Sequence, residues 1–353
     1  MNHKKMIING LHHLGQFLAQ FTSEIATPSR DVRHNDLFFD GFKHQLKLAQ
    51  EHNGWFTPSN LIFALNQWQT ALKKSNLEHW LAPYTIPAKT PKTVAIIMAG
   101  NIPLVGFHDF ISALVTGHQV LIKQSSNDRH LLPFLVAYIK HIMPELKDKI
   151  SFSDDKLDHY DAVIATGSNN SARYFETYFK DKPAIIRKNR NSVAILTGKE
   201  TPQELSHLAE DVFRYYGLGC RSVSKLFVPR DYNFDEFFQA MYDWHPIMNS
   251  AKYANNYDYN KAVYLMSEFQ LLENGFLMLK EDSRYASPIA TLFYEFYDNT
   301  AELQDRLEKD QQLIQCVVTT NDFPDTIAFG QTQYPALSDY ADNIDTVDFL
   351  LKI

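Results

Sequence analysis

Residues 93–123, TVAIIMAGNIPLVGFHDFISALVTGHQVLIK, hold the pattern that decides the fold. A short β-branched run ends at Gly100, a helical stretch begins near Val105, and a second apolar run, QVLIK, closes the segment. A strand, a helix and a second strand in this order predict two parallel strands joined by a crossover helix. The alternation continues through a helix near Leu131–Ile142, the strand DAVIAT, the helix SARYFETYF, and the strands AIIRK and SVAILTG. We therefore predict an α/β fold with a twisted parallel sheet.

The flanking sequence predicts how the chain is divided. Residues 1–90 have apolar residues at helical spacing, and prolines 83, 87 and 91 end that pattern. After Thr201 a helix is closed by Gly217, and YGLGCRSVSKLFVP turns into a strand. The strands PIATLFYEFY and IQCVVTT with a helix between them complete a predicted second α/β unit, with residues 233–285 mostly helical. We expect N-terminal helices and a Rossmann-type domain at 1–197, a catalytic domain at 198–330, and a tail at 331–353 that serves oligomerisation.

Composition excludes several classes of protein. The 353 residues are 45% hydrophobic and 21% charged, which is ordinary for a globular protein. A formal net charge of −7 argues against a nucleic-acid-binding surface. No apolar run has the length of a membrane span. His12 and His13 interrupt the N-terminal apolar run, which argues against a signal peptide. Two distant cysteines favour a reduced, cytoplasmic setting over a disulfide framework.

Familiar short motifs are absent, so candidate binding residues are sought at the ends of the predicted strands. The sequence has no G-x-G-x-x-G, Walker A, HExxH or CxxC motif, and no spacing that supports a metal site. In a doubly wound sheet, ligands bind at the carboxyl ends of the strands. The positions to examine are therefore Gly100 and Asn101, residues 123–128, and Gly167 with Ser168.

Cys220 is the candidate nucleophile. It lies in YGLGCRS, where two glycines allow close backbone approach and Arg221 adds positive charge that favours a thiolate. The alternative is that Cys220 is a small buried apolar residue with no part in catalysis. Cys316, inside the apolar run IQCVVTT, is expected to have that buried role.

Five segments together resemble the acyl-CoA reductase family typified by the bioluminescence fatty-acid reductase, a branch of the aldehyde dehydrogenase superfamily. They are AGNIPLVGF, LIKQSSND, ATGSNNS, YYGLGCRSVSKLFVP and QYPALSDYADNIDTVDFL. The resemblance runs from about Asn53 to the C-terminus. It implies an aldehyde-dehydrogenase-like fold with a Rossmann-type cofactor domain and an α/β catalytic domain, and a homo-oligomer by analogy.

The resemblance also implies roles for particular residues. The Asn101 amide and the Cys220 backbone N–H would stabilise the oxyanion formed by thiolate attack. Lys123 would contact the adenosine ribose, with Ser125 and Ser126 in the same cofactor-binding segment. NAD-preferring relatives have an acidic residue where this chain has Ser126, so we expect NADP(H), with NAD(H) as the alternative. Gly167 and Ser168 correspond to the turn close to the cofactor.

Departures from the superfamily pattern indicate the direction of the reaction. Hydrolytic relatives place a glutamate before the strand SVAIL, but residues 185–191 contain no carboxylate to activate water. Basic Arg187, Lys188 and Arg190 stand there instead, either as contacts for CoA phosphates or as a solvated charged loop. The resemblance therefore implies reduction of a donor that is not hydrolysed.

Together these features predict NADPH-dependent reduction of a fatty acyl-CoA to an aldehyde through a Cys220 thioester. Two alternatives remain open. One is an acyl-phosphate reductase of the glutamyl-phosphate reductase type, which would use the same thiol. The other is a non-catalytic cofactor-binding subunit of an acyl-processing complex, associated with partner enzymes of acyl metabolism.

Overall fold

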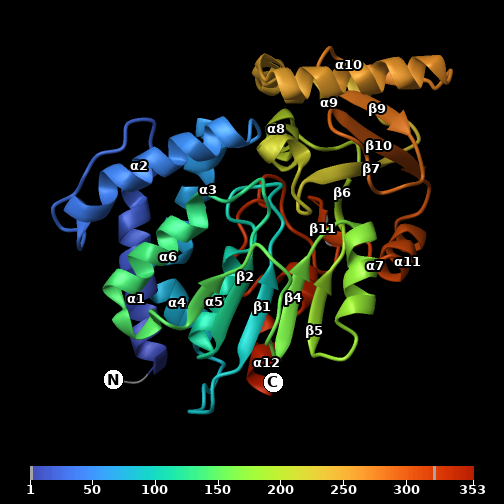
Figure 1. Cartoon of the computed structure of the whole chain (residues 1–353). Helices are drawn as coiled ribbons and strands as arrows, with labels where there is room; N and C mark the ends of the chain where they lie inside the picture. Colours follow the sequence, from blue (N-terminus) through green and yellow to red (C-terminus); the bar gives the residue numbers. More distant parts are fainter. Residues whose placement is uncertain (1–2, 321–322) are drawn as a thin grey trace. The chain divides into compact units, whose positions relative to one another are not determined.

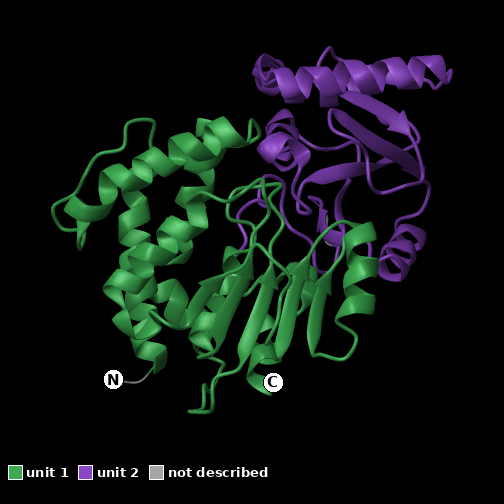
Figure 2. Ribbon diagram, in the orientation of Figure 1, with its two compact units in different colours: residues 1–188, 336–353 green, residues 189–335 purple. Residues whose placement is uncertain are grey.

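The computed structural model describes residues 3–320 and 323–353 of the chain. Its contacts divide into two compact units, coloured separately in Figure 2: unit 1 is 1–188 with 336–353, and unit 2 is 189–335. The strand Asn191–Ile195, which we expected at the end of the first domain, pairs with strands of unit 2. The observed division therefore falls one strand earlier than the expected boundary after residue 197.

Four helices form the N-terminal part of unit 1, as the sequence predicted. They are α1 (His3–Leu18), α2 (Asn35–His52), α3 (Pro58–Ala71) and α4 (Lys74–Leu81) (Figure 1). The apolar face of α1 is buried because Ile7, Leu11, Leu14 and Leu18 recur at helical spacing. At its end Phe17 stacks on Tyr138, with ring centroids 4.4 Å apart. These helices thus join the hydrophobic core of the unit.

A five-stranded parallel sheet forms the centre of unit 1. Its strand order is β3-β2-β1-β4-β5, and each neighbouring pair is parallel. The strands are β1 (Thr93–Ile97), β2 (Gln119–Lys123), β3 (Ile150–Phe152), β4 (Ala162–Thr166) and β5 (Ala184–Arg187), connected in part by α5 (Phe107–Val115), α6 (Leu131–Ile142) and α7 (Asn169–Tyr178). The doubly wound sheet is confirmed. The three-residue β3 was not predicted, because it is too short to show a periodic pattern.

The two faces of this sheet are covered by different helices. Val94 and Ile96 belong to the core cluster that includes residues of α1, α5 and α6, whereas Ala95 packs in a second cluster with Phe175 and Phe179 at α7. Successive strand residues point to opposite faces, so β1 is buried on both sides. The strand order reverses at β1, since β2 follows on one side and β4 lies on the other. In such folds this reversal marks the ligand-binding crevice, at the carboxyl ends of the strands.

Unit 2 contains a six-stranded sheet with the order β11-β6-β7-β10-β9-β8. The strands are β6 (Asn191–Ile195), β7 (Val223–Pro229), β8 (Leu271–Glu273), β9 (Met278–Glu281), β10 (Thr291–Tyr297) and β11 (Ile314–Val318), and the helices are α8 (Pro202–Phe213), α9 (Phe234–Met241), α10 (Ala251–Met266) and α11 (Thr300–Lys309). The second α/β unit is therefore confirmed. The expectation that 233–285 is mostly helical was wrong for β8 and β9, which pair antiparallel at the edge of the sheet.

The C-terminal segment returns to unit 1. Helix α12 (Thr346–Lys352) packs against α5, and Val347 and Leu350 are completely buried. The Lys89 ammonium donates to the carbonyl oxygens of Leu351 and Ile353, each at 2.9 Å, which caps the end of this helix. The role in oligomerisation that we expected for the tail stays a prediction.

A buried ion pair anchors this segment. Arg187 at the end of β5 lies 2.6 Å from an Asp109 carboxylate oxygen of α5, and both side chains are buried. The same guanidinium donates to the carbonyl of Ala341 at 2.7 Å and to the Thr346 hydroxyl at 3.0 Å. Arg187 is therefore part of the core of unit 1, and neither expectation for it, a CoA-phosphate contact or a solvated loop, was right.

Removing the Arg187 guanidinium should destabilise the protein strongly. Arg187→Met leaves the Asp109 carboxylate buried without its cation, which typically costs about 3–5 kcal/mol. Urea unfolding followed by circular dichroism measures this loss. Lys188→Met is the matched control, because Lys188 and its partner Glu176 are both about half exposed and such a pair contributes about 0–1 kcal/mol. Equal losses of unfolding free energy for the two substitutions would contradict the role of the Arg187–Asp109 ion pair in the stability of the protein.

Among the described residues, no helix combines the length and apolar character needed to cross a membrane.

Candidate active site

The loop after β1 carries Asn101, which is exposed. The preceding residue, Gly100, lies against the loop after β2: a Cβ at this position would be 2.7 Å from the Ser125 side chain. Any larger residue would push the two loops apart, so glycine permits their close approach. The loop of Asn101 and the loop of Ser125 therefore form one packed surface at the carboxyl edge of the sheet.

The end of β2 brings together the residues expected to bind the adenosine ribose. Ile97 of β1 pairs in register with Lys123, so Lys123 lies level with the end of β1. Its ammonium donates to the carbonyl oxygen of Asp155 at 2.8 Å. Ser126 is exposed, and its carbonyl accepts a hydrogen bond from His52 Nε2 at 2.7 Å. The hydroxyl at position 126 thus stands on a fixed backbone.

The end of β4 leads directly into α7 through Gly167 and Ser168. The Ser168 hydroxyl accepts the backbone N–H of Ser171 at 3.2 Å and caps the helix. A Cβ on Gly167 would be 2.8 Å from the Ser171 Cβ, so only glycine fits this tight turn. The first N–H groups of a helix carry partial positive charge and suit a phosphate. The turn at Gly167 and this helix terminus are therefore residues that could hold a phosphate group of a cofactor.

Cys220 lies in unit 2, on the turn that enters β7, and it is exposed. The Ser192 hydroxyl, completely buried, donates to the carbonyl oxygen of Cys220 at 3.0 Å. The N–H of Ser222 donates to the carbonyl of Gly219 at 3.0 Å and closes the turn. The backbone around Cys220 is thus fixed while the residue stays exposed, as a nucleophile requires. By contrast Cys316 is buried on β11, as expected.

Three consecutive residues before this turn have left-handed backbone conformations. Tyr215, Tyr216 and Gly217 have φ angles of 54°, 59° and 73°. For a non-glycine residue this conformation costs about 1–2 kcal/mol. Such strain persists only where surrounding contacts impose it, and it is frequent at functional sites. The sequence showed the glycine but gave no signal for the two strained tyrosines.

A buried carboxylate connects this turn to the end of unit 2. Asp211 of α8 is completely buried and accepts hydrogen bonds from the N–H of Gly330 at 2.6 Å and from the N–H and hydroxyl of Thr332 at 2.9 and 2.7 Å. Burial raises the pKa of Asp211 despite these bonds. The Thr332 carbonyl in turn accepts Arg221 Nε at 2.7 Å, beside Cys220. Arg221 therefore orients the turn through Thr332, in addition to the charge for which it was singled out.

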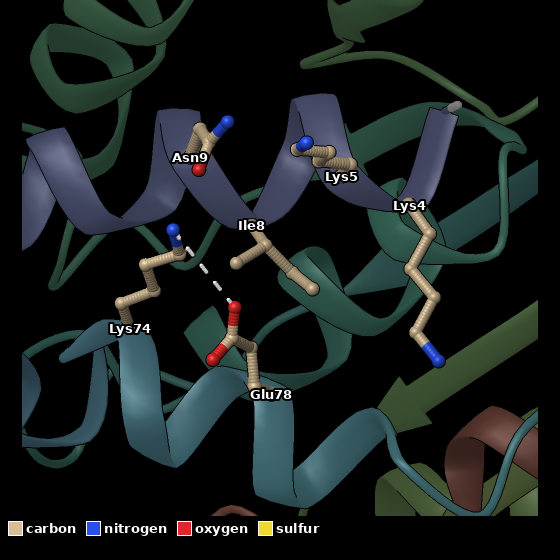
Figure 3. Close-up of a pocket in the computed structure, with 6 residues that line it drawn as sticks. All are labelled: Lys4, Lys5, Ile8, Asn9, Lys74 and Glu78. Atoms are coloured by element: carbon tan, nitrogen blue, oxygen red, sulfur yellow. Dashed lines mark ion pairs between the residues drawn. The ribbon is translucent and has the colours of Figure 1, made fainter. Parts of the chain in front are cut away.

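The pocket in Figure 3 lies elsewhere in unit 1, between α1 and α4. Its volume is about 200 Å³, and an ion pair between Lys74 and Glu78 crosses one side of it. None of the residues predicted for catalysis or cofactor binding lines it. Within the described ranges, no group of three or more His, Cys, Asp or Glu residues is placed to hold a metal ion.

Solved structures of aldehyde dehydrogenases share this architecture. Aldehyde dehydrogenase 21 of Physcomitrella patens, solved with succinate, matches with a TM-score of 0.61 at 12% identity, over 91% of this chain and 79% of its own. The Mycobacterium tuberculosis aldehyde dehydrogenase, solved with NAD+, matches with a TM-score of 0.58 at 14% identity, over 84% of this chain and 70% of its own. The fold is therefore of the aldehyde dehydrogenase type, as predicted.

The family follows from the sequence match. The model of the acyl-CoA reductase (LuxC) family matches residues 73–251, more than half of the chain. The chain belongs to this family, and the predicted resemblance is confirmed. The matched segment is shorter than the one we described, which ran from about Asn53 to the C-terminus.

A curated relative is the long-chain acyl-protein thioester reductase of Aliivibrio fischeri. It is 24% identical over an alignment 232 residues long, which covers 59% of this chain and 47% of the relative. The chain thus spans about half the length of the relative that it matches.

Replacing Asp211 should loosen the turn of Cys220 at a distance. Asp211→Ala leaves buried N–H groups without an acceptor, at about 1–3 kcal/mol each. We expect faster hydrogen exchange in peptides covering 327–335 and 218–224, measured by mass spectrometry at neutral pH. Glu308→Ala, an exposed carboxylate of α11, is the control and should change neither peptide. Unchanged exchange at 218–224 in Asp211→Ala would mean that Arg221 does not transmit the constraint.

Proposed function

We propose that the protein reduces an acyl thioester to an aldehyde, with Cys220 as the nucleophile and a nicotinamide cofactor as the reductant. The observation that carries this proposal is an exposed cysteine on a backbone-fixed turn in a member of the acyl-CoA reductase (LuxC) family. The reversal of strand order at β1, with Gly100 and Gly167 at neighbouring strand ends, supports the cofactor.

The proposed chemistry begins with attack of the Cys220 thiolate on the carbonyl carbon of the donor. A carbon–sulfur bond forms at Sγ, and the thiolate of the donor leaves with the electron pair of the broken bond. The carbonyl oxygen carries negative charge in the tetrahedral adduct, and the Asn101 amide donates a hydrogen bond to it. A reduced nicotinamide, which Lys123, Gly167 and Ser168 would hold, would supply a hydride to the carbonyl carbon; the carbon–sulfur bond then breaks, giving the aldehyde and the Cys220 thiolate.

The reductive direction is supported by what stands between β5 and β6. Residues 185–191 contain no carboxylate that would activate a water molecule against the thioester. Arg187 in this segment is held in its ion pair with Asp109. The enzyme thioester is therefore left for reduction, because hydrolysis lacks a general base in this segment.

We propose an acyl-CoA, with a fatty acyl chain, as the donor. The family description names acyl-CoA, whereas the printed name of the Aliivibrio fischeri relative names a long-chain acyl-protein thioester. Both donors are thioesters and would react in the same way with Cys220. An acyl phosphate is the third donor to compare, since only the leaving group differs.

We propose NADPH as the reductant. Position 126, at the end of β2 where a carboxylate would bind the ribose hydroxyls of NAD, has an uncharged and exposed serine. A neutral residue accepts the 2′-phosphate that a carboxylate would repel. NADH is the alternative.

Removing the thiol tests the covalent route. NADPH consumption is measured with acyl-CoA thioesters of increasing chain length, an acylated carrier protein and an acyl phosphate. Cys220→Ala should abolish turnover with every donor, while NADPH binding, followed by its fluorescence, stays within about threefold because chemistry and cofactor binding are separate functions. Cys316→Ala, at the buried cysteine of β11, should remain active. Substantial turnover by Cys220→Ala would overturn the proposal.

A charge at position 126 tests the cofactor. Ser126→Asp should weaken NADPH binding by about tenfold or more, because a charge near the 2′-phosphate is worth about 1–4 kcal/mol, and NADH binding should be unchanged or tighter. Ser126→Ala, which adds no charge, should keep the NADPH preference. Equal effects of Ser126→Asp on both cofactors in a fluorescence titration would show that the 2′-phosphate does not lie near this residue.

A further inference from the structure

A buried carboxylate joins the two loops at the carboxyl edge of the sheet in unit 1. Asp128 lies on the loop after β2 and is only 7% exposed. Its Oδ2 accepts the backbone N–H of Leu104, on the loop after β1, at 2.8 Å. This bond ties the loop that carries Asn101 to the loop that carries Ser125 and Ser126.

The bond acts on an unusual backbone. Leu104 has a φ of 57°, in the left-handed region, which costs about 1–2 kcal/mol for a residue with a Cβ. Its side chain is buried. Leu104 follows Asn101 by three residues, so the carboxylate at its N–H helps to fix the conformation of the whole 101–104 turn.

Burying this acceptor as a carboxylate costs folding free energy. The second oxygen, Oδ1, is buried and has no hydrogen-bond partner among residues 3–320 and 323–353. Burial accordingly raises the pKa of Asp128 to about 6. At neutral pH the ionised form is therefore a cost to the folded state, and an uncharged acceptor would serve the Leu104 N–H with less desolvation.

The loop on the Asp128 side is held by further contacts. Gln124 Nε2 donates to the Asp128 carbonyl at 3.0 Å, and Asn53 Nδ2 donates to the Asn127 carbonyl at 3.3 Å. His52 binds the Ser126 carbonyl, as described above. These bonds fix the backbone of residues 126–128. Through its bond to the Leu104 N–H, the Asp128 carboxylate then restrains residues 101–104.

We propose that Asp128 is a positioning residue for the reaction: its bond to the Leu104 N–H sets the 101–104 turn and so fixes the Asn101 amide relative to the cofactor loop. This inference rests on the role of Asn101 in the proposed function. It assigns to residue 128 a task that is separate from the cofactor contacts expected for Lys123, Ser125 and Ser126.

The test compares two substitutions in the full chain. Asp128→Asn keeps an oxygen that accepts the Leu104 N–H, whereas Asp128→Leu has similar size and no acceptor. We expect Asp128→Leu to lower kcat about 100-fold, because misplacement of a catalytic group by about 1 Å has an effect of that size, with the KM for the donor within about threefold. Asp128→Asn should keep kcat within about threefold. Asp148→Leu, which removes an exposed carboxylate of the same unit, should behave as wild type.

A double-substitution cycle links the effect to Asn101. If Asp128 acts through the amide, Asp128→Leu should lower kcat little further in an Asn101→Ala background. Full additivity of the two substitutions would overturn the proposal, and so would a kcat of Asp128→Leu close to that of wild type. Fluorescence titration should show NADPH binding within about threefold of wild type in each variant.

Hydrogen exchange measures the effect of Asp128 on the 101–104 turn without requiring turnover. A peptide covering 99–106 should exchange faster in Asp128→Leu than in wild type and Asp128→Asn, whether or not a donor is reduced. Absence of turnover in the wild-type protein would refute the proposed function, while this exchange would still decide whether Asp128 sets the turn. Unchanged exchange in Asp128→Leu would refute the positioning role. Asp128→Asn should be at least as stable as wild type at pH 7, since it removes the buried charge, and it serves as the folded reference.

Discussion

The structure of unit 1 depends on the pairing of β1 with β2 on one side and β4 on the other. In this register Ile97 lies level with Lys123 and with Ala165, so the loops that follow all three strands begin at the same edge of the sheet. Because β1 is buried on both faces, a slip by one residue would exchange the side chains that face its two clusters. The register therefore determines where every candidate cofactor residue of this unit stands.

Buried aspartates hold the irregular segments that the strands leave unfixed. Asp109 anchors the C-terminal segment through Arg187, Asp128 holds the turn after β1, and Asp211 holds Gly330 and Thr332 near the turn of Cys220. A carboxylate can accept several bonds from backbone N–H groups that no strand partner reaches. Burying each of these carboxylates costs desolvation free energy, so holding the irregular segments in this way lowers the stability of the folded protein.

The candidate site shows where pattern-based reasoning succeeds and where it stops. Gly100, Gly167 and Cys220 were singled out as candidates because a glycine next to a strand end and a cysteine in a glycine-rich turn are local signals. Arg187 was misjudged, because a basic residue between two strands looks exposed until its partner on α5 is known. The sequence did not indicate that Asp128 and Asp211 link separate segments, because the N–H groups that they accept lie far along the chain.

The sequence by itself determined the alternation of strands and helices, the two α/β units, the family, and the difference between an accessible and a buried cysteine. These follow from periodicity, composition and motifs within short segments. Only the tertiary structure decided that residue 191 begins a strand of the second sheet, that 271–281 contains two edge strands, and that Tyr215 and Tyr216 are strained. Such features arise from contacts between residues distant in sequence, whose packing overrides the local preference.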